Sequence, residues 1–136
     1  MATAKSGAER PLSPHLQIYR PMLTMMMSIA HRISGVGNAV GFLLLAWWLL
    51  ALASGPERYA QVSSFFGGIA GRALLFLFSW SLIHHMLGGI KHLIWDLGYG
   101  FGPVEREWLT AATLFGSIGF TIVIWIVGYL VMGVIR

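Results

Sequence analysis

Cysteine is absent from the sequence, and charged residues are scarce. Of the 136 residues, 57% are hydrophobic and 10% are charged, whereas soluble domains contain about 25% charged residues. The absence of cysteine excludes disulfides and thiolate metal sites. The small net charge of +4 does not indicate nucleic-acid binding. The apolar composition therefore indicates a membrane protein rather than a soluble domain.

Charge is missing altogether from three stretches of the chain, which are residues 33–56, 73–90 and 108–135. A helix needs roughly 20 apolar residues to cross a bilayer, so each stretch is long enough to form the core of a span. The sequence therefore predicts an all-α integral membrane protein with three transmembrane helices in a bundle. We expect these helices at about residues 22–53, 69–97 and 107–135.

Residues 1–27 are predicted to form a polar N-terminal arm ahead of a transmembrane domain at residues 28–136. Three prolines discourage helix in the arm. The arm has too long a polar stretch for a signal peptide, and no small-residue cleavage site follows the apolar run. A short amphipathic stretch at residues 57–66 connects the first two expected spans.

The distribution of lysine and arginine predicts the orientation of the bundle, because cytoplasmic loops carry an excess of these residues. Six of them lie on the side that holds the start of the first helix and the loop after the second, and three lie on the opposite side. We therefore expect a cytoplasmic N-terminus and an external C-terminus. The six are Lys5, Arg10, Arg20, Arg32, Lys91 and Arg106, and the three are Arg58, Arg72 and Arg136.

The second expected helix carries a stripe of polar residues and glycine on one face. At about 100° per residue, this stripe contains His85, and His84 points away from it. His85 lies about 16 Å along the helix from Asp96, which places it near the bilayer midplane if Asp96 is at the interface. Imidazole is a standard axial ligand of haem iron, and Gly89 would let a flat macrocycle approach. Alternatively, His85 hydrogen-bonds a neighbouring helix and the glycines only pack helices closely. The full stripe is Ser81, His85, Gly89, His92 and Asp96.

The start of the first helix places Ser28, His31, Arg32 and Gly35 on one face by their spacing. Arg32 would lie just inside the membrane boundary, where an arginine often extends to lipid headgroups. The alternative is that the cation faces an anion or a polarised carbonyl. In that case Ser28 and Arg32 would hold a quinone carbonyl, and His31 and Arg32 would pair with haem propionates.

Three blocks of sequence together resemble a known family. They are residues 10–19 (RPLSPHLQIY), residues 28–35 (SIAHRISG) and residues 85–96 (HMLGGIKHLIWD). In order and spacing they are similar to the cytochrome b556 subunits of succinate dehydrogenase, which is respiratory complex II. The resemblance extends from residue 10 to about residue 135, although the third helix matches only in hydrophobicity and length.

The resemblance implies an electron-transfer subunit that does not oxidise succinate itself. Its partners would be a second small membrane-anchor subunit, an iron–sulfur subunit and a flavoprotein subunit. His85 would be one axial ligand of haem b, with the other ligand supplied by the partner anchor. Ser28 and Arg32 would lie at the ubiquinone site, and His31 and Arg32 near the haem propionates. Asp96 would mark the cytoplasmic end where the iron–sulfur subunit docks.

Two other interpretations remain open at the level of the sequence. In one, the chain is a self-contained cytochrome b in which His31 and His85 both ligate a single haem, although their expected depths in the membrane differ. In the other, it is a haem-free anchor or a small transporter subunit. The arm lacks an Arg- and Ser-rich transit segment, which favours a bacterial inner membrane over a mitochondrial one.

Overall fold

The computed structural model describes residues 19–133. All regular secondary structure in this part of the chain is helical. Within these residues, three helices are long and apolar enough to cross a membrane. These are α1 (Leu23–Ala53), α3 (Ile69–Asp96) and α4 (Pro103–Val131). A shorter helix, α2 (Pro56–Gly67), connects α1 to α3. The all-α fold with three long apolar helices predicted from the sequence is confirmed.

Glycine and proline set the helix boundaries. Gly55 has a φ of 108°, which turns the chain between α1 and α2, and Pro56 occupies the first turn of α2. The last long helix begins at Pro103 rather than near residue 107 as expected. Proline at the first helical position has no N–H to leave unsatisfied, and the Glu105 carboxylate accepts a hydrogen bond from the Gly102 N–H (3.3 Å). This helix ends at Val131, about four residues before the expected end near residue 135.

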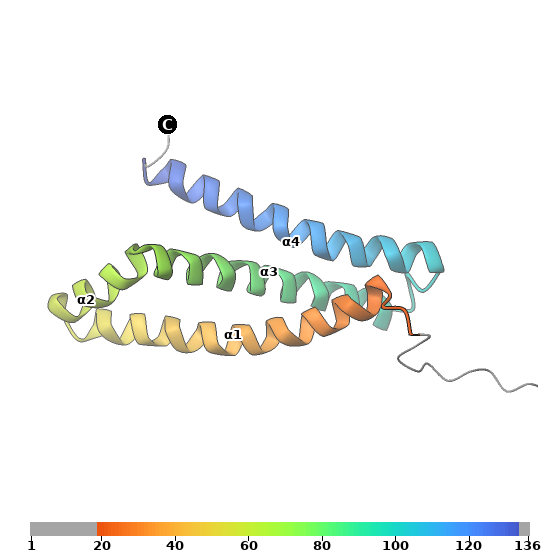
Figure 1. The fold of residues 1–136 in the computed structure, drawn as a ribbon, viewed down its shortest axis with the longest axis horizontal. Coiled ribbons are helices and arrows are strands. Elements are labelled where there is room, and N and C mark those ends of the chain that lie inside the picture. Colours follow the sequence, from red (N-terminus) through yellow and green to blue (C-terminus); the bar gives the residue numbers. More distant parts are fainter. Residues whose placement is uncertain (1–18, 134–136) are drawn as a thin grey trace, which may run out of the picture.

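The helices run antiparallel in sequence order, so the described chain enters at one end of the bundle and leaves at the other (Figure 1). The start of α1, the end of α3 and the start of α4 lie at the same end, and α2 lies at the opposite end. α3 packs against α1, α2 and α4, while α4 diverges from α3 toward its own C-terminal end (Figure 1). Which end faces the cytoplasm stays a prediction, and most of the 1–27 arm lies outside the described residues.

The interior of the bundle is polar and its outer surface is apolar. Leucine and isoleucine side chains face outward, for example Leu43 (71% exposed) and Ile69 (91% exposed). This arrangement suits a lipid environment, in which polar side chains join helices to one another instead of facing solvent. The buried polar residues are Ser34, Asn38, Ser81, His84, Lys91, Thr110, Thr113, Ser117 and Thr121.

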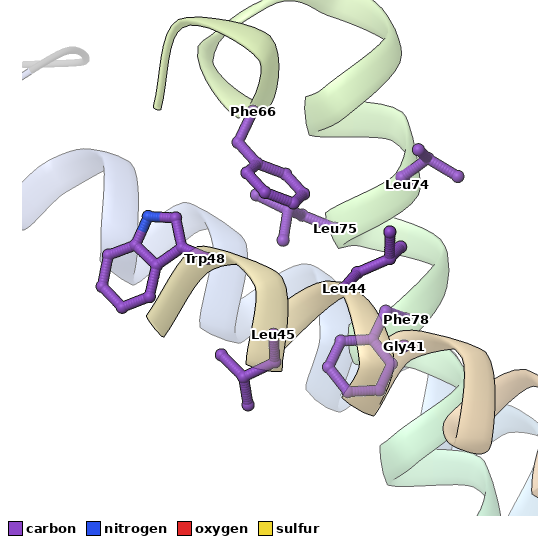
Figure 2. Close-up of a pocket in the computed structure, with 8 residues that line it drawn as sticks. All are labelled: Gly41, Leu44, Leu45, Trp48, Phe66, Leu74, Leu75 and Phe78. Atoms are coloured by element: carbon purple, nitrogen blue, oxygen red, sulfur yellow. The ribbon is translucent and has the colours of Figure 1, made fainter. Parts of the chain in front are cut away.

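At the end of the bundle near α2, by contrast, the buried side chains are apolar. Ala51, Val62 and Phe66 form a small buried cluster there, with Leu44 and Trp48 packed against it. Beside this cluster, α1, α2 and α3 enclose a recess of about 340 Å³ (Figure 2). None of the side chains that line it is ionisable. The residues with candidate chemistry lie toward the other end of α1 and α3.

Candidate functional site

His31 on α1 and His85 on α3 face each other across the helix interface. Their imidazole rings stack, with centroids 4.0 Å apart and an interplanar angle of 9°. His92, which lies about two turns after His85, makes an edge contact with His31 at 5.1 Å. The structure thus brings together the histidine of the first helix and two histidines of the stripe on the second.

The two stacked histidines exchange hydrogen bonds with each other's backbone. His31 Nε2 lies 3.2 Å from the carbonyl oxygen of His85, and His85 Nδ1 lies 3.1 Å from the carbonyl oxygen of His31. A carbonyl only accepts hydrogen bonds, so the nitrogen that faces it carries the proton. His31 is therefore protonated on Nε2 and His85 on Nδ1. The Nε2 atom of His85 keeps its lone pair and has no hydrogen bond to any other described residue.

Glycines allow this close approach of α1 to α3. A Cβ atom on Gly35 would lie 3.1 Å from His85 Cε1, and one on Gly88 would collide with the His31 ring. Each imidazole thus lies over a glycine of the opposite helix. Gly89 is different, because a Cβ atom there would meet nothing within 4 Å. The two adjacent glycines have separate roles, with Gly88 packing against α1 and Gly89 bordering open space.

A group of buried polar residues lies beside His85. Ser34 Oγ donates to the His31 carbonyl (2.8 Å) and lies 3.2 Å from His85 Nδ1. Ser81 Oγ is within donating distance of both Asn38 Oδ1 (2.8 Å) and the Ser34 carbonyl (2.9 Å). Sequence reasoning placed Ser81 on the stripe but did not identify Ser34 or Asn38. The sequence signal that could have identified these two residues is their spacing of four, which places two polar side chains on one face of an otherwise apolar helix.

His84 occupies a different environment from its neighbour. Its side chain is fully buried (0% exposed), stacks on Trp80 and lies with Nδ1 3.2 Å from Ser117 Oγ on α4. Its Nε2 atom has no hydrogen-bond partner within residues 19–133. The α4 helix therefore covers His84, whereas His85 is only partly buried and contacts α1.

Ser28 and Arg32 lie on the second and third turns of α1, and both are exposed in the isolated chain. Neither makes a side-chain hydrogen bond to His31 or His85 in the part of the chain described. Asp96 is the last residue of α3 and is also exposed. Lys91, one turn before the end of α3, is instead buried (5% exposed), with Nζ 4.8 Å from the centre of the Trp95 ring.

Comparison with known proteins identifies the family of the chain. Residues 6–128 match the family described as the succinate dehydrogenase/fumarate reductase transmembrane subunit. A succinate dehydrogenase cytochrome b556 subunit of Paracoccus denitrificans is 36% identical over 118 residues, which cover 87% of this chain and 90% of the relative. The Rickettsia prowazekii cytochrome b556 subunit is also 36% identical over 118 residues, with coverages of 87% and 92%.

A mitochondrial relative is similar over a smaller share of its own length. The mouse succinate dehydrogenase cytochrome b560 subunit is 35% identical over 111 residues, which cover 80% of this chain and 65% of the mouse protein. The family match contains the whole of α1 and α3, including the stacked histidines. The chain therefore belongs to the family of succinate dehydrogenase/fumarate reductase transmembrane subunits.

Proposed function

We propose that this chain is the membrane-anchor cytochrome b subunit of a succinate:quinone oxidoreductase, which binds haem b and helps to form the ubiquinone site. One observation in the structure carries the haem assignment. The Nδ1–H group of His85 donates a hydrogen bond to the carbonyl of His31, and this leaves the Nε2 lone pair free for iron. Histidines that bind metals commonly donate their other N–H to a carbonyl in this way.

The chain is a multi-pass protein of the inner membrane, as its three apolar helices and bacterial relatives indicate. We propose that its partners are a second small membrane-anchor subunit, an iron–sulfur subunit and a flavoprotein subunit. The end that holds the start of α1 and the end of α3 would face the cytoplasm and the iron–sulfur subunit. Electrons would then reach the histidine-bearing end of the bundle first.

The residues around His85 fit a haem with one axial ligand from this chain. His85 Nε2 would bind the iron, and the open space at Gly89 leaves room beside α3 for a flat group. His31 and Arg32 would lie near the propionates, with Arg32 supplying the positive charge. The haem, when bound, would act as a one-electron carrier. The second axial ligand would come from the partner anchor subunit.

Ser28 and Arg32 are proposed to bind ubiquinone. Arg32 is one residue from His31, and Ser28 is one helical turn before Arg32, so both lie at the histidine-bearing end of α1. A guanidinium and a hydroxyl would orient a quinone carbonyl and stabilise the negative charge that develops on its oxygen during reduction. Because both side chains are exposed in the isolated chain, the partner subunits would complete the site around them.

The geometry disfavours a self-contained cytochrome in which His31 and His85 ligate the same haem. Two axial imidazoles point their nitrogen atoms at an iron between them, from opposite faces of the macrocycle. Here the two rings lie face to face 4.0 Å apart. His31 Nε2 is also engaged by the carbonyl of His85. Binding one haem between them would require the stacked rings to separate, and ligation through His31 Nε2 would break its contact with the His85 carbonyl.

The adjacent histidines give a matched pair of variants for the test. We expect the His85→Ala complex to lose or shift the b-type band in a reduced-minus-oxidised spectrum of native membranes. The His84→Ala complex should keep that band, because His84 is enclosed by α4. Complex assembly is checked in both by native electrophoresis. An unchanged band in an assembled His85→Ala complex would show that another residue or another protein binds the haem.

A further inference from the structure

Ser34, Asn38 and Ser81 form a buried polar group between α1 and α3, directly beside His85. Their exposed fractions are 5%, 7% and 8%. A buried hydroxyl or amide in an apolar environment is costly unless it is hydrogen-bonded. Each of these three side chains has a partner within the group or on the adjacent backbone. The group is thus a connected network rather than a set of isolated polar residues.

The directions of these hydrogen bonds determine which nitrogen of His85 carries its proton. Ser34 Oγ donates its only hydrogen to the His31 carbonyl, so its lone pairs are left to face His85 Nδ1 at 3.2 Å. The His31 carbonyl faces the same nitrogen at 3.1 Å. Both oxygens around Nδ1 are therefore acceptors. An unprotonated Nδ1 would place its lone pair against both of them.

Ser81 fixes the position of Ser34. Its hydroxyl lies between the Ser34 carbonyl and the Asn38 side chain, and it is four residues before His85 on the same face of α3. Gly37 leaves space for this contact, since a Cβ atom there would lie 3.1 Å from Ser81 Oγ. The α1–α3 register is therefore fixed by polar contacts one helical turn from the proposed ligand.

We infer that Ser34 is a positioning residue for His85, which holds the proton on Nδ1 and thereby directs Nε2 toward the iron. This inference rests on the proposed function, because its effect is felt at a haem bound to His85. A second acceptor on Nδ1–H makes the imidazole a more basic ligand. A more basic ligand stabilises the ferric state and lowers the reduction potential of the haem. Ser34 therefore helps to set how readily the haem accepts an electron.

The experiment uses the assembled complex with Ser34→Ala, and Ser54→Ala serves as the matched control. Ser54 caps the C-terminal end of α1, at the far end of the bundle from His85. Like Ser34, it donates a hydrogen bond to a backbone carbonyl of α1 (Leu50, 2.7 Å). The measurements are the haem content, the midpoint potential of the haem, and the electron paramagnetic resonance spectrum of the oxidised haem. For Ser34→Ala we expect normal haem content, a more positive potential and a shifted spectrum. Ser54→Ala should match the wild type, and Ser34→Thr, which keeps the hydroxyl, should return the potential toward it.

Wild-type potential and spectrum in the Ser34→Ala complex would overturn the inference. If that complex does not assemble, Ser34→Cys replaces it, because a thiol fills similar space but is a weaker acceptor. Failure of both to assemble beside a normal Ser54→Ala complex would also overturn it, since Ser34 would then be a packing residue. The His85→Ala spectrum separates these outcomes from failure of the proposed function. If His85→Ala keeps the haem band, the ligand assignment itself is wrong.

Discussion

Gly88→Ala tests the packing of α1 on α3 directly. A Cβ atom at this position would collide with the His31 ring and lie 2.9 Å from His31 Nε2. If the ring stays in place, the overpacking costs about 1–3 kcal/mol. If it moves, the bundle loses an intramembrane hydrogen bond of about 0.6 kcal/mol and a ring stack of about 0.5–1.5 kcal/mol. Alanine favours helix over glycine by about 1 kcal/mol, so the net destabilisation relative to the wild type is about 0–2 kcal/mol by either route.

The assay is the thermal midpoint of the purified complex, followed by loss of the native band on electrophoresis. Gly119→Ala is the matched control, because a Cβ atom there would meet nothing within 4 Å. It receives the same gain in helix propensity without the collision, so its midpoint should equal or exceed that of the wild type. A Gly88→Ala midpoint as high as that of Gly119→Ala would refute the contact between His31 and Gly88.

Three further predictions follow from the same geometry. Arg32→Ala should lower quinone reductase turnover at least tenfold while complex assembly changes little. The physical reason is that a guanidinium that stabilises developing charge contributes about 1.4 kcal/mol or more to the transition state. Turnover equal to that of the wild type in an assembled complex would remove Arg32 from the quinone site. Gly89→Ala should reduce haem content, since its methyl group would enter the space left open beside α3, and full haem occupancy would contradict that use of the space. Ser117→Ala should lower the thermal midpoint of the complex by leaving His84 without its α4 partner, and should leave the haem spectrum unchanged.

Helical periodicity predicted much of this arrangement. The uncharged stretches located the three long helices, and the 100° step placed His85 and His84 on different faces of α3. Periodicity says which residues share a face, but it does not give the register between two helices. The stacking of His31 on His85 depends on that register, so the sequence did not predict it. The roles of Ser34 and Asn38 were missed for the same reason.

Local chemistry accounts for the other differences from expectation. The last helix begins at Pro103, four residues before the expected start near residue 107, because proline is favoured in the first turn of a helix. Lys91 was counted among the cations at the membrane boundary, but its side chain is buried with its ammonium over the Trp95 ring. A cation that lies over an aromatic face is partly compensated for the loss of water.

The two adjacent histidines explain how one helix serves both packing and chemistry. Consecutive residues on α3 point about 100° apart, so His84 faces α4 while His85 faces α1. Enclosure leaves His84 Nε2 inaccessible to any large ligand. Glycines on α1 and α3 instead leave space around His85, and Ser34 Oγ and the His31 carbonyl are the two acceptors for its proton. The surroundings of the ring, and not the presence of an imidazole alone, therefore select His85 as the proposed ligand. Exchanging the two environments would require rotating α3 by a full residue step, which the contacts of Ser81 with Ser34 and Asn38 oppose.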